Sequence, residues 1–182
     1  MDDIRKDMLS LRKAMDSEAR IKADKAIFEN IMSLETVKKA KRVFTYISTK
    51  YEADTVSFIN RCFKEGKEVF VPVTLKERMY FSKIETLEGL KKSKMGIPEP
   101  ESTAEEMPFE NDLFIIPGSV FDVYGHRYGY GAGYYDKFLS NCKPVLKIAL
   151  CYDFQLVEKI ATEEHDIDMD MIITDKRIVG GE

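Results

Sequence analysis

Two short, almost entirely apolar runs constrain the fold of this chain most strongly. "DLFIIP" spans residues 112–117, and "VLKIALCY" spans residues 145–152. Such runs are typical of β-strands that are covered on both faces, as in a parallel sheet between helices. We therefore expect both runs to be strands of one sheet, with helices on both of its faces.

A strand–helix–strand unit precedes these runs. "VFTYIS" (residues 43–48) and "EVFVPVT" (residues 68–74) are rich in β-branched and aromatic residues and are expected to be strands. Between them we expect a helix from about Asp54, ended by Gly66, with one apolar face formed by Val56, Ile59 and Phe63. This order favours parallel pairing of the two strands.

The remaining pattern completes an α/β architecture. Ile4, Met8, Leu11 and Met15 recur at helical spacing, and Ser17 is expected to begin a second helix. We also expect a strand at 78–84, extended chain at 95–100, a helix around 154–160 and a last strand at 169–174. The prediction is an α/β fold with a Rossmann-like, mostly parallel central sheet, in one domain spanning residues 1–182.

Composition excludes several classes of function. A net charge of −4 argues against a sequence-independent nucleic-acid binder, which normally carries a basic surplus. No run has the length of a signal peptide or of a membrane span, so we expect a cytoplasmic protein without a membrane partner. We also expect a monomer or weak dimer. The three cysteines are expected to be reduced, and two histidines make a zinc site improbable.

Between the two apolar runs lies a glycine-rich stretch, "GHRYGYGAGYYDKF" (residues 125–138). Gly129, Gly131 and Gly133 allow positive φ, so that successive backbone amides can face one anion, and a helix is expected directly afterwards. The stretch matches neither GxxxxGK[ST] nor GxGxxG, and a plain turn before a helix remains an alternative. Phosphate is the ligand that this pattern fits.

The neighbours of the glycines favour binding. His126 and Arg127 supply hydrogen-bond donors at the entrance, and Asp136 is an oxygen ligand suited to magnesium. Flat faces for an adenine or pterin ring are offered by Tyr130, Tyr134 and Tyr135, although packing against the sheet is an equal alternative for Tyr135.

Two carboxylates elsewhere are further candidates. Glu52 follows the first strand, where it could accept paired hydrogen bonds from an amino-substituted heterocycle or stabilise the start of the next helix. Asp166, in the acidic run of residues 163–171, could join Asp136 around magnesium or belong to a solvated surface. The sequence shows no Ser/His/Asp or Cys/His arrangement, so a reaction driven by positioning, magnesium and phosphate contacts fits best.

The stretch "HRYGYGAGYYDKFL" resembles the signature of the 5-formyltetrahydrofolate cyclo-ligase family, also called 5,10-methenyltetrahydrofolate synthetase. That signature reads approximately R-[LFY]-G-x-G-x-G-[YF]-Y-D, and every position from Arg127 to Asp136 fits it. Further segments resemble the family in the same order: "IRKDMLSLRKAM", "YISTKYEADT", "VFVPVT", "MGIPEP", "DLFIIPGSVFD" and "EEHDIDMDMIIT".

The resemblance implies an enzyme that depends on ATP and magnesium and acts on 5-formyltetrahydrofolate. ATP would phosphorylate the formyl oxygen, N10 would attack the activated carbon, and loss of phosphate would leave 5,10-methenyltetrahydrofolate. A folate- or nucleotide-binding module without turnover, and a sugar-phosphate isomerase or acyltransferase on a related sheet, are the alternatives.

By the same resemblance, Arg127 and Asp136 are the catalytic candidates, and Asp136 and Asp166 are the magnesium ligands. ATP contacts are assigned to Arg5, Arg127, Tyr128, Gly129, Tyr130, Gly131, Ala132, Gly133, Tyr134 and Tyr135. Folate contacts are assigned to Ile47, Glu52, Tyr130, Gly131, Ala132, Gly133 and Tyr134. The chain departs from the family at Met1, where a lysine is usual, and at Ala132, where glycine or lysine is common.

Overall fold

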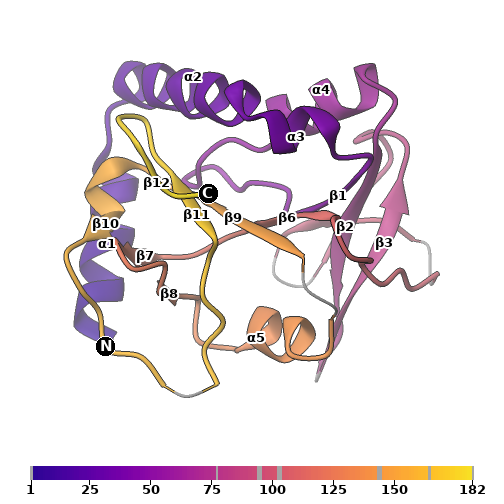
Figure 1. Cartoon of the computed structure of the whole chain (residues 1–182). Helices are drawn as coiled ribbons and strands as arrows, with labels where there is room; N and C mark the ends of the chain where they lie inside the picture. Colours follow the sequence, from indigo (N-terminus) through magenta and orange to yellow (C-terminus); the bar gives the residue numbers. More distant parts are fainter. Residues whose placement is uncertain are drawn as a thin grey trace.

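A seven-stranded sheet runs through the protein, whose computed structural model describes residues 2–76, 78–93, 96–101, 104–142, 145–163 and 165–181 (Figure 1). The strands follow the order β12-β11-β9-β6-β1-β2-β3 across the sheet. Their bounds are β1 (Arg42–Thr45), β2 (Glu68–Thr74), β3 (Met79–Ile84), β6 (Leu113–Ile116), β9 (Leu146–Leu150), β11 (Met171–Ile173) and β12 (Ile178–Gly180).

The five inner strands are parallel. Val43 of β1 lies opposite Val69 of β2 on one side and Leu113 of β6 on the other, and β9 and β11 continue the parallel pairing. The edge strands β3 and β12 pair antiparallel. Numbered along the chain, the parallel strands take the doubly wound order 2-1-3-4-5, in which ligands bind beyond the carboxyl ends of the strands where the order reverses. Here that point lies between β1 and β6.

Helices cover both faces of the sheet, as the apolar runs predict. In Figure 1, α2 (Ser17–Ser33), α3 (Glu35–Lys39) and α4 (Val56–Lys64) lie on one side, and α5 (Tyr134–Leu139) lies on the other. The first side buries aliphatic residues such as Ile27 and Ile59 against the strands. The second side is rich in aromatic residues, among them Phe44 and Phe114, whose rings stack at 5.4 Å. The expected α/β fold with a mostly parallel sheet is confirmed.

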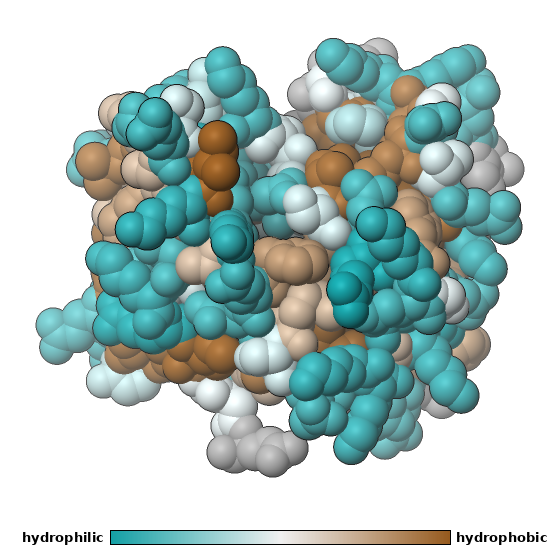
Figure 2. All heavy atoms as spheres, turned by 90° about the horizontal axis from the view of Figure 1, so that it is seen from above, coloured by the Kyte–Doolittle hydropathy of each residue, from teal (hydrophilic) through white to brown (hydrophobic). Residues whose placement is uncertain are grey.

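The outer surface of the α2–α4 layer is mostly hydrophilic, with separate hydrophobic areas between the charged residues (Figure 2). This distribution is expected for amphipathic helices that turn their apolar faces toward a sheet. Among the described residues, no helix combines the length and the apolar composition needed to cross a bilayer. The cysteines are free thiols, with Cys62 and Cys151 buried and Cys142 partly buried.

Local signals set the helix boundaries. Asp16 caps α2 by accepting hydrogen bonds from the backbone amides of Glu18 and Ala19, a contact that contributes about 1 kcal/mol. Gly66 follows α4 with a φ of 71° and ends it as expected. The buried face of α4 is formed by Phe58, Ile59 and Cys62, whereas the expected Val56 and Phe63 lie half-buried at its margins.

A smaller sheet of order β10-β7-β8 leads the chain into the glycine-rich stretch. It consists of β7 (Val120–Asp122), β8 (Arg127–Tyr128) and β10 (Leu156–Val157). The first helix, α1 (Asp2–Ala14), packs against it through Ile4 and Met8, which contact the cluster of Val120, Tyr128 and Ile160. The expected N-terminal helix is therefore present, and it lies beside β8.

The prediction of a helix around residues 154–160 is wrong. That segment forms one 3₁₀ turn (Asp153–Gln155) and then β10, which pairs in parallel with β7. The buried side chain of Gln155 accepts from the backbone amide of Tyr152 and donates to the carbonyl of Ser119 at 3.0 Å. The bond to Ser119, 36 positions away, and the pairing of β10 with β7 take the place of helical hydrogen bonds in this segment.

One smaller expectation is also corrected, and the extended chain expected at 95–100 is found in the described part of that segment. The strand β11 is not the last, because the chain turns at Thr174, whose hydroxyl accepts from the amides of Lys176 and Arg177, and returns as β12. In the segment 95–100, the extended chain is the short β5 (Pro98–Glu99), which pairs with β4 (Lys91–Lys92). Met95 lies outside the described residues.

Candidate active site

The glycine loop, residues 129–133, connects β8 to α5 beyond the carboxyl ends of β1 and β6. Gly131 has a φ of 101° and Gly133 a φ of 65°, in a backbone region that residues with a side chain rarely adopt. Gly129 is needed for a different reason, because a Cβ there would lie 2.9 Å from Nη1 of Arg127. Ser119 anchors the loop by donating to the carbonyl of Gly129 at 3.2 Å.

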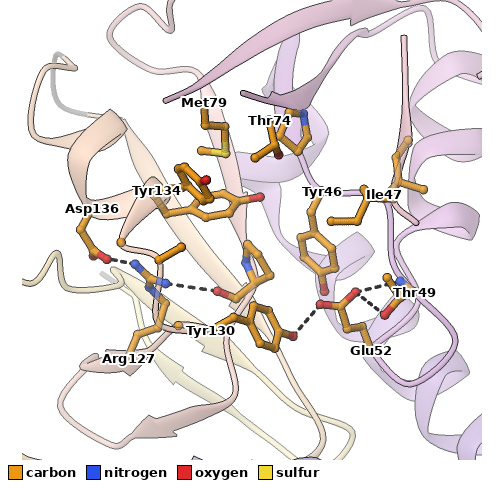
Figure 3. A pocket seen from close by; sticks show the side chains of 17 residues that line it. Tyr46, Ile47, Thr49, Glu52, Thr74, Met79, Arg127, Tyr130, Tyr134 and Asp136 are labelled. Atoms are coloured by element: carbon orange, nitrogen blue, oxygen red, sulfur yellow. Dashed lines mark hydrogen bonds and ion pairs between the residues drawn. The ribbon is translucent and has the colours of Figure 1, made fainter. Parts of the chain in front are cut away.

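On one side of the loop is a mainly apolar cavity of about 170 Å³, here called the apolar pocket (Figure 3). It lies where the strand order reverses, since Tyr46 and Ile47 follow β1 and Pro117 follows β6. The strand β1 ends at Thr45, so Tyr46 and Ile47, expected inside a strand, leave the sheet and reach the pocket. Its other lining residues outside the loop include Thr49, Glu52, Pro72, Thr74, Met79, Ile97, Tyr134 and Tyr135.

Glu52 provides the carboxylate of the apolar pocket. Its Oε2 accepts from the amide and the hydroxyl of Thr49, both at 2.8 Å, and its Oε1 accepts from the hydroxyl of Tyr130 at 2.5 Å (Figure 3). The start of α4 is instead capped by Asp54, whose carboxylate accepts from the amides of Val56 and Ser57. Asp54, and not Glu52, therefore stabilises the start of this helix.

Tyr130 keeps its proton at neutral pH. Although half of its surface is exposed, its hydroxyl is enclosed between Arg12 and Glu52. This enclosure raises the pKa of Tyr130 well above its usual range, and the negative charge of Glu52 raises it further. The phenol is thus a stable donor to the Glu52 carboxylate.

On the other side of the loop is a cavity of about 380 Å³, here called the polar pocket. It shares Arg127, Gly129, Gly133 and Asp136 with the apolar pocket, so these residues form a common wall. The rest of its lining is mostly charged or polar, and consists of Arg5, Tyr128, Gly131, Lys137, Ser140, Glu163, His165 and Asp166.

Arg127 and Asp136 are paired within the common wall (Figure 3). Nη2 of Arg127 donates to Oδ1 of Asp136 at 2.6 Å, and only 3% of the arginine side chain is exposed. The buried Nε of Arg127 has no hydrogen-bond partner among the described residues. An unsatisfied buried donor is costly, and an oxygen atom of a bound anion would satisfy it.

The N-terminal helix contributes to the polar pocket. Arg5 lies on α1 with its guanidinium 5.1 Å from the centre of the Tyr128 ring, and it lines the polar pocket. Its contact with ATP stays a prediction. Met1, where the family usually has lysine, lies outside the described residues.

Two carboxylates suited to magnesium, Asp136 and Asp166, line the same pocket. Oδ2 of Asp166 accepts from the amide of Glu163 at 2.8 Å. Within the described residues, which leave out Glu164, no group of three or more potential protein ligands surrounds one point. Magnesium commonly uses one or two carboxylates and completes its shell with substrate phosphates and water, so this donor set fits it.

The structure divides the predicted contact residues between the two pockets. Ile47, Glu52, Tyr130, Ala132 and Tyr134 line only the apolar pocket, and Gly131 lines only the polar one.

Two expectations about the flanking residues change. Tyr135 packs edge-on against Phe81 and Phe114, which confirms the packing alternative, and it also lines the apolar pocket, so its role in binding a ring stays a prediction. His126, expected at the entrance, lines neither pocket, because its Nδ1 is held 2.8 Å from Oδ2 of Asp122.

Several site residues had not been singled out from the sequence. Tyr46, Thr49 and Pro117 follow strand ends at the point where the strand order reverses, so the rule for doubly wound sheets could have found them. Thr74 and Met79 belong to the β2–β3 pair and carry no local signal. Lys137, Ser140 and His165 of the polar pocket were also missed.

This chain is similar to known proteins over most of its length. A sequence model of the 5-formyltetrahydrofolate cyclo-ligase family matches residues 1–175. A probable 5-formyltetrahydrofolate cyclo-ligase from Caenorhabditis elegans is 29% identical over 186 residues, covering 94% of this chain and 90% of the relative. The 5-formyltetrahydrofolate cyclo-ligase of Saccharomyces cerevisiae is 30% identical over 196 residues, covering 93% and 92%.

Solved structures show the same similarity. The 5,10-methenyltetrahydrofolate synthetase of Aquifex aeolicus superposes with a TM-score of 0.87 at 30% identity, covering 98% of this chain and 91% of that one. The corresponding protein from Mycoplasma pneumoniae superposes with a TM-score of 0.77 at 25% identity, covering 96% and 98%.

Proposed function

Because the chain belongs to the 5-formyltetrahydrofolate cyclo-ligase family, we propose that it converts 5-formyltetrahydrofolate to 5,10-methenyltetrahydrofolate while ATP is cleaved to ADP and phosphate. The observation that carries this proposal is the common wall of the two pockets. A flat, partly apolar substrate on one side and a polyanion on the other would meet at Arg127 and Asp136. Transfer of a phosphoryl group between two substrates requires such an arrangement.

The folate is proposed to occupy the apolar pocket. Its aromatic and aliphatic lining, including Tyr46, Ile47 and Tyr134, suits a flat ring, and Glu52 supplies the acceptor for the amino-substituted edge of the pterin. The hydrogen bonds from Thr49 hold the Glu52 carboxylate in one orientation, which reduces the entropy lost on binding.

ATP is proposed to occupy the polar pocket. Arg5, Arg127 and Lys137 bring three positive charges to it, and the backbone of the glycine loop can approach phosphate oxygens without obstruction by side chains. The buried, unpartnered Nε of Arg127 supports an anion at the common wall. Magnesium would be held by Asp136 and Asp166, where it neutralises negative charge on the phosphates when bound.

The reaction then proceeds in two balanced steps. The formyl oxygen attacks the γ-phosphorus, its new P–O bond forms, and the bond to ADP breaks. The lone pair of N10 next attacks the activated formyl carbon, the carbon–oxygen bond breaks, and phosphate leaves with that oxygen while the proton of N10 passes to solvent. Arg127 stabilises the charge that develops during transfer, and the apolar lining of the apolar pocket limits the access of water to the activated carbon.

A single assay tests the proposal. The protein is mixed with 5-formyltetrahydrofolate, ATP and magnesium, and methenyl product is followed by absorbance together with ADP release. We expect equal amounts of the two products, and none when ATP is omitted. Measurable folate binding without any product at high protein concentration would instead identify a binding module that lacks turnover.

A further inference from the structure

Arg12 is a buried charge to which no role has yet been given. It lies on α1, only 4% of it is exposed, and it lines neither pocket. Its Nε donates to the carbonyl of Tyr51 at 2.8 Å, and its Nη1 donates to the hydroxyl of Tyr130 at 2.9 Å. No carboxylate forms an ion pair with it in the described part of the chain. Buried arginines are rarely left without a counter-charge.

The counter-charge of Arg12 is reached through a tyrosine. The Tyr130 hydroxyl accepts from Arg12 and donates to Oε1 of Glu52 at 2.5 Å. The phenol therefore joins a guanidinium to a carboxylate, and both of its hydrogen bonds are charge-assisted. Such bonds are shorter and stronger than neutral ones, and adjacent bonds in a chain polarise one another.

Both ends of this chain are fixed by the fold. Arg20 of α2 donates to the carbonyl of Arg12 and, through Nη1, to the hydroxyl of Tyr152 at 3.1 Å. The single hydroxyl proton of Tyr152 is within reach of two acceptors, Oδ1 of Asp24 at 2.9 Å and the carbonyl of Glu52 at 3.2 Å. Arg12 is thus held against the same segment that carries the Glu52 carboxylate.

We propose that Arg12 is a positioning residue for the folate, acting through Tyr130 to hold the Glu52 carboxylate oriented toward the pterin edge. This inference rests on the proposed function and adds to it a group that does not touch the substrate. Because Arg12 lies at the Glu52 end of the apolar pocket, it acts on folate affinity and leaves ATP affinity and the transfer step unaffected.

The first test compares the variants Arg12→Met and Lys13→Met. Lys13 is the exposed neighbour of Arg12 on α1, so both changes remove one positive charge from the same helix. For Arg12→Met we expect KM for 5-formyltetrahydrofolate to rise about tenfold, as for loss of one hydrogen bond to a charged group, with kcat and KM for ATP nearly unchanged. Arg12→Lys, which keeps the charge and one donor, restores part of the affinity, and Lys13→Met changes none of these parameters.

A double-mutant cycle shows whether Arg12 acts through Tyr130. The hydrogen-bonded chain Arg12–Tyr130–Glu52, here called the relay, is already broken in a Tyr130→Phe background. Adding Arg12→Met to that background should therefore change the folate KM by less than about twofold. The full Arg12→Met effect in that background would overturn the inference. A fall in kcat together with similar rises in the KM values for folate and for ATP would also overturn it, because such changes would indicate a general structural role.

A spectroscopic measurement separates this inference from the proposed function. The protein is labelled with carbon-13 at the phenolic carbon of tyrosine, and the Tyr130 signal is assigned from its absence in Tyr130→Phe. Arg12→Met and Glu52→Gln should each shift that signal in the substrate-free protein, and Lys13→Met should not. If the wild type neither binds nor converts the folate, the proposed function fails. The same spectra still decide the relay: an unmoved Tyr130 signal in Arg12→Met contradicts it.

Discussion

Nη2 of Arg127 and Oδ1 of Asp136 lie 2.6 Å apart in the wall that the two pockets share. The arginine is the first residue of β8, and the aspartate lies in the first turn of α5, so the glycine loop between them sets their separation. A cation that faces two pockets, fixed by a carboxylate, is suited to stabilise charge passed from one bound substrate to the other.

The first prediction concerns Asp136. In Asp136→Asn the side chain keeps its shape and one acceptor for Arg127 but loses its charge, so we expect kcat to fall by about a hundredfold or more, as when one charge-stabilising group is removed from an active site. Circular dichroism should show an unchanged fold. Asp168→Asn, in an exposed carboxylate, serves as the control and should keep its turnover. A normal kcat in Asp136→Asn would refute the assigned role.

The second prediction concerns Glu52. Glu52→Gln keeps the size of the side chain but removes its charge and replaces one acceptor oxygen by a donor. It therefore weakens the hydrogen bonds that Glu52 accepts from Thr49, from Tyr130 and from the pterin edge. The Kd for 5-formyltetrahydrofolate should rise by about ten- to a hundredfold, and the Kd for ATP should stay constant. Calorimetry with each ligand measures both, and the exposed Glu88→Gln is the control. Equal weakening of both ligands would place Glu52 outside the folate site.

The third prediction separates two uses of glycine. In Gly129→Ala the new Cβ would lie 2.9 Å from Nη1 of Arg127, so the guanidinium must shift, and we expect a kcat loss with little change in Tm. Gly66→Ala introduces strain at a φ of 71° but meets no atom within 4 Å, so it should cost about 1 kcal/mol of stability and leave kcat unchanged. A stability loss with normal kcat in Gly129→Ala, together with a kcat loss in Gly66→Ala, would contradict this explanation of the glycine loop.

The fourth prediction concerns Asp122, which is fully buried in the turn before Arg127. Burial raises the pKa of this carboxyl, but donors from Ile160, His126 and Tyr124 outweigh it, so the folded pKa is lowered. Asp122 therefore contributes stability that is present above its unfolded pKa of about 3.9 and is lost as pH falls through the folded value.

Asp122→Asn should accordingly lower the free energy of unfolding by about 2 kcal/mol at neutral pH, because the amide cannot accept all of these hydrogen bonds. Urea titrations at several pH values should show the two proteins converging below about pH 4. A difference that stays constant down to the acid end would show that charge plays no part.

Regular patterns made much of the fold predictable. Alternating and continuous apolar runs marked β2, β6 and β9, and Asp16 and Gly66 carry the chemistry of helix ends in their own side chains or backbone. The helix prediction for the segment 154–160 was wrong because the structure of this segment depends on partners that are distant in the sequence. Ile160 donates to Asp122, which lies 38 positions earlier, and no local signal reports that contact.

The candidate site likewise contains residues that the sequence could predict and residues that it could not. The glycine loop could be predicted from the sequence, because alternating glycines have few uses other than a positive φ or the close approach of another atom to the backbone. Arg12 could not be recognised, because "IRKDMLSLRK" reads as an ordinary basic helix in which Lys6 and Lys13 are exposed. Only the packing of α1 beside the loop distinguishes its one buried arginine from its solvated neighbours.

The central claim is that the two pockets meet so that the formyl oxygen receives the γ-phosphoryl group of ATP. We would label the formyl group of 5-formyltetrahydrofolate with oxygen-18, allow conversion with unlabelled ATP in unlabelled water, and determine the mass of the released phosphate. The account predicts one oxygen-18 atom in each phosphate. Phosphate without the label, alongside full methenyl formation, would show that the oxygen leaves by another route and would contradict direct transfer across the common wall.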